Sequence, residues 1–320
     1  MFFMTRISMK SNTKVTWNDG FNTFLQEHII LKNLTEATLK YYKDYVQYSW
    51  YNYYDKNSYL QDINQDTINN YVLFLKNREI KDSTINTYLK ALHTIISFFK
   101  QKGWCYDVEV NLIKDTKTKI EVYSDDDIAK LLKKPDMNKC KFAEYRNWVI
   151  INFLCNTGVR RSTLINIKIE DLDLVNGYCN CTHTKNRKTL TVPLTKSMCL
   201  ILQEYITKLP ADCKYLFPNV LSEKMQPRTL TLEINVYNKS RGVTITSVHA
   251  FRHWFAKKSV MNGVNIVQLQ HILGHSNLDI LKNYVEMLTE DLQYKDASQN
   301  PLESILLKHK SKKTIKLKED

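Results

Sequence analysis

The sequence predicts a mainly α-helical protein of two domains, with a small antiparallel β-sheet in the second. Helical periodicity dominates the first hundred residues, fades between residues 102 and 121, and resumes at Ser124. Residues 165–194 instead alternate between apolar and polar side chains, as half-buried strands do. A chain of 320 residues with 43% hydrophobic side chains can bury two cores. We therefore expect domains at residues 1–101 and 122–300, joined by a linker at residues 102–121.

The first domain is expected to be a four-helix unit. Its last helix has the strongest pattern, with apolar side chains at i, i+3, i+4 and i+7. Ser83 and Thr84 are expected to cap this helix, and Gly103 is expected to end it. The apolar positions of the last helix are Ile85, Tyr88, Leu89, Leu92, Ile95, Ile96 and Phe99, and three weaker patterns contain Trp17, Phe21, Phe24 and Leu25, then Leu39, Tyr42 and Val46, then Ile68, Tyr71, Val72 and Leu75.

The second domain is expected to begin with helices and then form a sheet. Acidic residues 125–127 follow Ser124 in a helical first turn, and a second helix runs from Phe142 to Asn156 before Gly158. Turns are expected at Asn176-Gly177 and Asn186-Arg187 within the strand-like stretch.

Helices are expected again from Pro210 to about Leu292. Residues 301–320 begin with Leu302, Ile305 and Leu306 and end in a Lys-rich tail. This pattern predicts a short docking helix followed by a basic end.

The charge of the chain favours a polyanionic partner. The formal net charge is +13 and the pI is near 9.2, and most of the excess follows Lys100, where the net charge is +10 against +3 before it. The sequence contains no run of eighteen apolar residues, so we expect no membrane-spanning helix. Nucleic acid is the leading candidate partner.

The ends and the cysteines favour a cytoplasmic protein. The start, MFFMTRISMK, has too short an apolar run for a signal peptide. Seven cysteines, an odd number, do not resemble a disulfide framework and fit a reducing compartment. Cys179 and Cys181 alternate with polar residues and are expected to be half-buried strand residues.

The stretch HAFRHWFA, residues 249–256, contains two histidines and an arginine within about one and a half helical turns. On a helix, His249 and His253 have the i, i+4 spacing of metal ligands, whereas His249 and Arg252 have an i, i+3 spacing that suits a phosphate. A solvated helix surface with nothing bound is the third alternative. The stretch by itself leaves all three open.

Four other places in the second domain carry similarly reactive side chains. Arg160 follows the glycine break in TGVR, and Lys185 is at the tip of the expected hairpin. His275 follows a glycine in LGH, and Tyr284 comes nine residues later. On one continuous helix His275 and Tyr284 would point to opposite sides, so they converge only if the chain turns between them. Each feature alone is ordinary.

Together these residues resemble the tyrosine recombinase (phage integrase) family. That family has an Arg in a TGxR corner, a hairpin Lys, an HxxR helix, an LGH corner and a Tyr nine residues later. The matching residues, in the same order, are Arg160, Lys185, His249, Arg252, His275 and Tyr284. The resemblance covers nearly the whole chain, because the first domain resembles the family's core-binding domain.

The resemblance implies a site-specific DNA recombinase with a two-domain clamp for duplex DNA. Tyr284 would attack a phosphodiester and form a 3′-phosphotyrosyl link, Arg160 and Arg252 would hold the phosphate, and His275 would position it. His249 would serve the tyrosine and Lys185 would protonate the leaving 5′-oxygen.

The family needs no cofactor and no metal, because the phosphotyrosine conserves the energy of the broken bond. The implied partners are double-stranded DNA with inverted-repeat core sites and three further copies of the chain in a homo-tetramer. An accessory directionality protein is compatible with this assembly. The resemblance also implies that the C-terminal segment docks on a neighbouring protomer. Because the chain starts almost directly at the core-binding domain, we expect a simple-site enzyme of a mobile element, plasmid or chromosome.

Two alternatives are a catalytically inactive DNA-binding relative and a metalloenzyme that uses the pairs His249/His253 and His271/His275. The metal hypothesis leaves the two arginines and the tyrosine without a role. The sequence also departs from the family at Thr163, where Glu is common, and at Asp279 and Leu281, where small hydroxyl residues are common.

Overall fold

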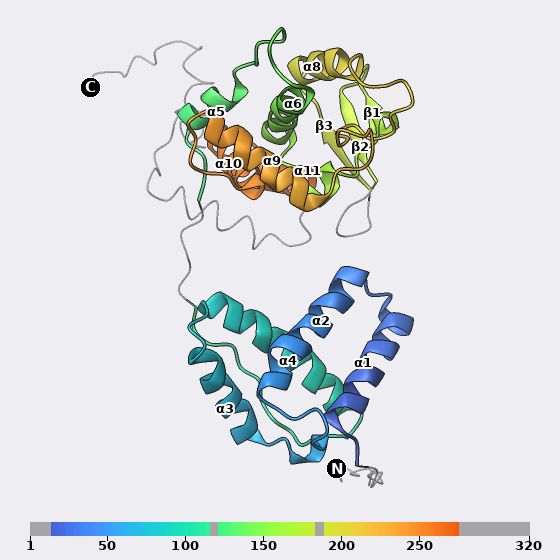
Figure 1. Cartoon of the computed structure of the whole chain (residues 1–320), viewed down its shortest axis with the longest axis vertical. Helices are drawn as coiled ribbons and strands as arrows, with labels where there is room; N and C mark the ends of the chain where they lie inside the picture. The colour runs from blue at the N-terminus through green and yellow to red at the C-terminus, as the bar shows by residue number, and fades with distance from the viewer. Residues whose placement is uncertain (1–13, 116–120, 183–188, 275–320) are drawn as a thin grey trace, which may run out of the picture. The chain divides into compact units, whose positions relative to one another are not determined.

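The computed structural model of the chain describes residues 14–115, 121–182 and 189–274 (Figure 1). The chain divides into two compact units, residues 1–119 and 120–320. Both units are mainly helical and the second contains a three-stranded antiparallel sheet, so the predicted fold class is confirmed. None of the helices in the described part is both long and apolar enough to cross a membrane.

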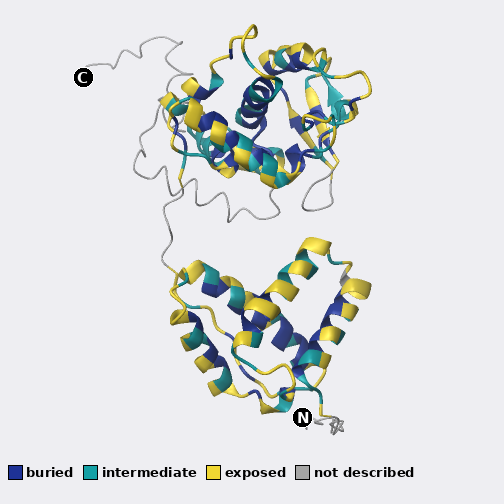
Figure 2. Cartoon of the chain, viewed as in Figure 1, coloured by how far each residue is buried: buried dark blue, intermediate teal, exposed yellow. Residues whose placement is uncertain are grey.

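The first unit contains the four predicted helices. The last of them, α4, supplies much of the buried core (Figure 2). Aromatic rings fill the space beside it, since Trp17 stacks on Trp50 with ring centroids 4.6 Å apart and meets Phe99 edge-on at 5.2 Å. The helices are α1 (Trp17–Lys32), α2 (Glu36–Tyr48), α3 (Gln65–Lys76) and α4 (Asp82–Gln101), with 3₁₀ turns η1 (Trp50–Asn52) and η2 (Leu60–Asp62).

The predicted start of α4 was wrong by two to three residues. The helix begins at Asp82 with Lys81 as its N-cap, so Ser83 and Thr84 lie inside it. The apolar face begins only at Ile85, but Asp82 stabilises an earlier turn through its charge at the helix N-terminus. The predicted stop is confirmed, because Gly103 has a φ of 71° just past the helix.

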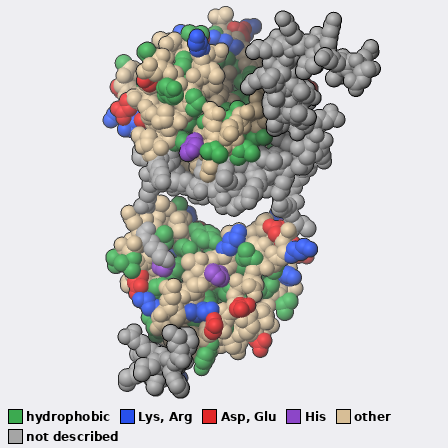
Figure 3. Space-filling model, turned by 180° about the vertical axis from the view of Figure 1, so that it is seen from behind, with side chains coloured by type: hydrophobic (Ala, Val, Ile, Leu, Met, Phe, Trp, Pro, Cys, Tyr) green, Lys and Arg blue, Asp and Glu red, His purple; other side chains and the backbone are tan. Residues whose placement is uncertain are grey.

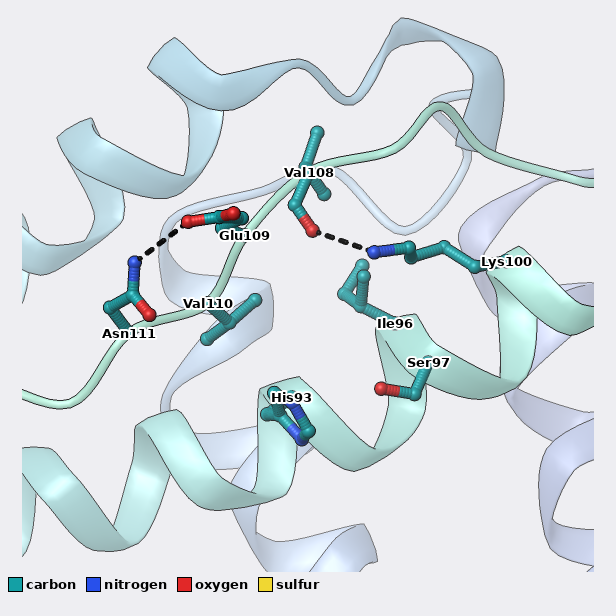
Figure 4. Close-up of a pocket in the computed structure, with 8 residues that line it drawn as sticks. All are labelled: His93, Ile96, Ser97, Lys100, Val108, Glu109, Val110 and Asn111. Carbon is teal, nitrogen blue, oxygen red and sulfur yellow. Dashed lines mark hydrogen bonds between the residues drawn. The ribbon is translucent and has the colours of Figure 1, made fainter.

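Residues 104–113 differ from the expected linker, because they pack against the first unit (Figure 4). The Lys100 Nζ donates to the Val108 carbonyl at 3.2 Å. The Gln65 side chain bonds both backbone groups of Glu109, at 2.9 and 3.1 Å, and the Asn86 side chain does the same for Ile113, at 2.9 and 3.0 Å. The amide side chains of Gln65 and Asn86 thus pair with backbone groups that a neighbouring strand would otherwise bond. Such pairing leaves no periodic apolar pattern, which explains why the sequence suggested a linker.

The second unit surrounds the buried helix α6 (Figure 2). Its strands pair in the order β1-β2-β3, and Cys181 of β2 lies opposite Leu190 of β3. The elements are α5 (Asp125–Leu132), α6 (Phe142–Thr157), α7 (Arg161–Leu164), η3 (Ile169–Asp171), β1 (Leu172–Asp173), β2 (Tyr178–Cys181), β3 (Leu190–Pro193), α8 (Lys196–Ile206), α9 (Pro227–Ser240), α10 (Val248–Met261) and α11 (Ile266–Leu273).

The sequence placed α5 and α6 correctly but overextended the strands. Among the described residues of the predicted stretch, 165–182 and 189–194, only residues 172–173, 178–181 and 190–193 are strands. The turn at Gly177 is confirmed by its φ of 73°, whereas Asn186-Arg187 lies outside the described residues.

The return to helix also differs from the prediction. Helix α8 precedes Pro210, and residues 210–226 form turns and isolated bridges. Pro210 follows α8, and Pro227 is the first residue of α9, a position where the missing N–H of proline costs no helical hydrogen bond. All seven cysteines are free, and Cys179 and Cys181 face the core.

The paired amide bonds at Ile113 give a testable consequence. Asn86→Ala is expected to lower the free energy of unfolding of the first unit by roughly 1–3 kcal/mol, because both Ile113 backbone groups lose their partner. Hydrogen exchange followed by mass spectrometry should show faster exchange in residues 104–115 and no change in residues 121–182. The control is Asn70→Ala, at an exposed position on α3, and equal exchange in the two variants would contradict the assignment.

Candidate active site

The corner at the end of α6 positions the first predicted site residue. The helix ends at Gly158, whose φ of 60° lies in the left-handed region. A Cβ at this position would lie 2.5 Å from Phe255 Cδ1 and 2.9 Å from Leu273 Cδ2. Glycine therefore permits both the turn and the close approach of α10 and α11. Arg160 follows as the N-cap of α7, in agreement with the corner predicted from TGVR.

Arg252, on α10, connects the ends of two other helices. Its side chain is buried, with 3% exposed. The Nη1 atom donates to the Gly158 carbonyl at 2.8 Å, and Nη2 donates to the Leu273 carbonyl at 2.8 Å. Two bonds from one planar guanidinium fix both its position and its orientation.

The guanidinium of Arg160 meets the same helix end. Its Nη1 lies 3.1 Å from the Gly274 carbonyl and 3.4 Å from the Leu273 carbonyl. The Leu273 carbonyl therefore accepts from both Arg160 and Arg252. Carbonyls at a helix C-terminus carry partial negative charge, so they hold the two cations without neutralising them. Burial lowers the pKa of Arg160, but a guanidinium stays protonated.

His249 lies in the first turn of α10, and its side chain is exposed. Partial desolvation of the ring lowers its pKa below the ordinary value of 6.5, and the positive charges of Arg252, Arg160 and Arg161 lower it further. The imidazole is therefore neutral at pH 7 and can accept a proton. The i, i+3 spacing of His249 and Arg252 thus places a proton acceptor beside a buried cation.

The glycine corner after α11 lies against the sheet. Gly274 has a φ of 60°, and a Cβ built on it would lie 3.3 Å from Leu190 Cδ2 and 3.8 Å from Arg160 Nη1. Leu190 is the first residue of β3. The end of α11, the start of β3 and Arg160 are therefore immediate neighbours.

The structure brings together three of the six predicted residues, namely Arg160, His249 and Arg252. Lys185, His275 and Tyr284 lie outside the described residues. Gly274, the residue directly before His275 in the chain, is described, and its carbonyl accepts a hydrogen bond from Arg160.

The described residues give the metal hypothesis little support. The rings of His249 and His253 lie side by side, with centroids 5.8 Å apart. Within residues 14–115, 121–182 and 189–274, no three His, Cys, Asp or Glu side chains group as metal ligands. His271 is exposed on α11, and its proposed partner His275 is outside the described residues.

Arg161 is a charged neighbour of the site that the sequence did not single out. It is exposed, and its Nη1 donates to Thr231 Oγ1 on α9 at 2.8 Å. Its charge lowers the pKa of His249. The signal was present in TGVRR, where two arginines follow the glycine break. Carbonyl acceptors such as Leu273 leave no sequence signal, because every residue has a backbone carbonyl.

Thr163 stands where the family often has Glu. Its side chain is buried, with 2% exposed, in the short helix that begins after Arg160. A threonine supplies no carboxylate, and Arg160 is instead held by the carbonyls of Leu273 and Gly274.

Basic side chains form no single patch on the face shown in Figure 3. On the face shown in Figure 3, Lys and Arg side chains are interspersed with acidic ones on both units. Positive charge is concentrated locally at the end of α11, where Arg160 and Arg252 both bond the Leu273 carbonyl.

Comparison with known proteins identifies the family. The model of the phage integrase family matches residues 121–291, more than half of the chain. The chain belongs to the phage integrase family. The resemblance deduced from the motifs is confirmed, and the protein is a tyrosine recombinase of this family.

Related recombinases match over most of their length. The tyrosine recombinase XerA of Pyrococcus furiosus is 25% identical over 257 residues, which cover 79% of this chain and 88% of XerA. The Tn1549 transposon integrase bound to transposon right-end DNA has a TM-score of 0.72 at 18% identity, with 91% and 100% of the two chains covered. The lambda integrase tetramer bound to a Holliday junction has a TM-score of 0.67 at 16% identity, with 86% and 78% covered.

The crowded glycine corner allows a direct test. Gly158→Ala is expected to lower the free energy of unfolding by roughly 2–5 kcal/mol, because it combines left-handed strain with a clash against Phe255. It should also abolish DNA cleavage, since the Gly158 carbonyl holds Arg252. Urea denaturation and a single-turnover cleavage assay measure the two effects.

A matched control separates strain from packing. Gly263 also has a positive φ, of 83°, but a Cβ there meets nothing within 4 Å. Gly263→Ala should cost only about 1–2 kcal/mol and leave cleavage intact. If both variants lost the same stability and activity, packing at Gly158 would not be the cause.

Proposed function

We propose that the recombinase cleaves and rejoins DNA through a covalent bond between Tyr284 and the 3′-phosphate of one strand. The observation that carries this proposal is the meeting of Arg160 and Arg252 on the Leu273 carbonyl, beside a neutral His249. Two fixed guanidiniums and a proton acceptor are the groups that an attack on a phosphodiester requires.

The arginines suit the charge that develops during phosphoryl transfer. The transition state spreads negative charge over the equatorial phosphate oxygens, so the protein mainly supplies position and cations. Guanidiniums offer paired, planar donors that never deprotonate. Because backbone carbonyls orient Arg160 and Arg252 in advance, little reorganisation is needed when the phosphate binds.

Proton transfer is assigned to three further groups. His249 takes the proton of the Tyr284 hydroxyl, whose ordinary pKa is near 10. Lys185 gives a proton to the departing 5′-oxygen, and His275 donates a hydrogen bond to the phosphate. Attack by a new 5′-hydroxyl then releases the tyrosine, so joining needs no nucleotide and no metal.

Duplex DNA with inverted-repeat core sites is the proposed substrate, and four copies of the chain act on two such sites. The net charge of +13 suits a polyanion. Structural neighbours include an integrase on transposon-end DNA and a tetramer on a Holliday junction. We assign the recombinase to integration, excision or resolution of a mobile element, with an accessory protein that sets direction.

Covalent trapping tests the nucleophile. The wild-type protein, incubated with nicked DNA fragments from around its own gene in the presence of EDTA, is expected to form an adduct that survives SDS. Tyr284→Phe lacks the attacking oxygen and should bind the same DNA without forming the adduct. Sequencing the trapped fragment would give the target site.

Two other outcomes would reject the proposal in different ways. Specific binding without an adduct would indicate the inactive DNA-binding relative. An adduct that appears only without EDTA would indicate metal-dependent chemistry, and an adduct with Tyr284→Phe would assign the nucleophile elsewhere.

The C-terminal segment is proposed to dock on a neighbouring protomer through Leu302, Ile305 and Leu306. Deletion of residues 301–320 is expected to leave binding to a single core site unchanged and to lower recombination between two sites at least tenfold. Mobility-shift and recombination assays on the same DNA measure the two effects. A control chain that lacks only the basic tail after Lys308 should keep its recombination rate, and an unchanged rate after the full deletion would contradict the proposal.

A further inference from the structure

The start of α10, which carries His249, is held by side chains from two other segments. The carbonyl of its N-cap residue, Ser247, accepts a hydrogen bond from Tyr123 Oη at 3.2 Å. The same carbonyl accepts from the Ala250 amide at 3.1 Å, in the first turn of the helix. His249 lies between Ser247 and Ala250 in this turn. The hydrogen bonds from Tyr123 and Ala250 to the Ser247 carbonyl therefore fix the backbone of His249.

The tyrosine hydroxyl belongs to a buried and directed chain of hydrogen bonds. Asn238, on α9 and fully buried, donates from Nδ2 to Tyr123 Oη at 2.8 Å and to the Ile245 carbonyl at 2.8 Å. Tyr123 is 3% exposed, and burial raises the pKa of its hydroxyl. The hydroxyl thus keeps its proton, accepts from Asn238 and donates to Ser247. Buried polar groups that are paired in this way specify one geometry.

The residues around Tyr123 hold α10 at two further points. The ring of Tyr123 stacks on Phe251, with centroids 4.3 Å apart and planes 28° apart. Asp125 accepts from Trp254 Nε1 at 3.1 Å and forms an ion pair with Lys258. Residues 123–125 therefore contact α10 along its length, and the hydroxyl of Tyr123 acts at the turn that contains His249.

We propose that Tyr123 is a positioning residue that places His249 for proton transfer during DNA strand cleavage. Arg252 is fixed independently, because it bonds the Gly158 and Leu273 carbonyls. His249 is one turn earlier and depends on the anchored Ser247 carbonyl. This inference rests on the proposed role of His249 in cleavage, and displacement of a reacting group by about 1 Å can lower a rate a hundredfold.

Tyr123→Phe removes the hydroxyl and keeps the ring that stacks on Phe251. It is expected to lower single-turnover cleavage roughly ten- to a hundredfold, with unchanged affinity for the same DNA. The assay uses the full chain and a nicked duplex containing the site at which the wild type forms its adduct.

Tyr237→Phe is the matched control. Tyr237 is also 3% exposed, and its hydroxyl donates at the same distance, 3.2 Å, to the carbonyl of Leu131 on α5 instead of a carbonyl of α10. Both variants should lower the Tm to a similar extent, but only Tyr123→Phe should slow cleavage. Equal cleavage rates in the two variants would overturn the inference.

The titration of His249 gives a readout that does not depend on activity. The groups that face it are Arg252 and His253 on its own helix, Arg160 after α6, and Arg161 on α7. A loosened imidazole is less close to the arginines that disfavour its protonation, so its pKa should rise in Tyr123→Phe and stay unchanged in Tyr237→Phe.

NMR of the labelled histidines, assigned with His249→Gln, measures this pKa in the free protein. The acid limb of the cleavage rate should move to higher pH by the same amount. An unchanged pKa in Tyr123→Phe overturns the inference even if the wild type forms no adduct, whereas a missing wild-type adduct with a shifted pKa rejects only the proposed function.

Discussion

The carbonyl of Leu273 is the point on which the described part of the site depends. It accepts hydrogen bonds from both Arg160 and Arg252, which come from segments about ninety residues apart. The two guanidiniums can share it only because Gly158 lets α10 and α11 pack against the end of α6. Any side chain at that glycine would separate the elements that carry the cations. The packing of α10 and α11 against the end of α6 therefore also determines where the two positive charges lie.

This constraint also determines the acid–base state of the site. Carbonyl acceptors orient the arginines and leave their charge available, and that charge disfavours protonation of His249. The replacement of a family Glu by Thr163 fits the same arrangement, because Arg160 is held by backbone groups. A neutral imidazole beside two oriented cations suits proton abstraction next to a phosphate. The bonds of Tyr123 and Asn238 extend this preorganisation to the backbone at the start of α10.

Some features could be predicted from the sequence because they depend on local patterns. The apolar spacing in α4 follows the helical repeat, and Gly103 and Gly158 supply the positive φ that ends α4 and α6. Errors arose where long-range contacts overrode local signals. Residues 104–113 pack through the amide side chains of Gln65 and Asn86, and residues 210–226 form turns tied to distant segments.

The sequence by itself determined the class of the protein, because the order and local motifs of its candidate residues match those of one family. Arg160, His249 and Arg252 were predicted as site residues through that resemblance, since their spacing alone left other interpretations open. Only the tertiary structure decided what holds them, since their partners are backbone carbonyls and a buried tyrosine hydroxyl from other segments. Backbone acceptors are the same in every residue, so no sequence pattern marks the Leu273 carbonyl, and folding alone brings it to both arginines.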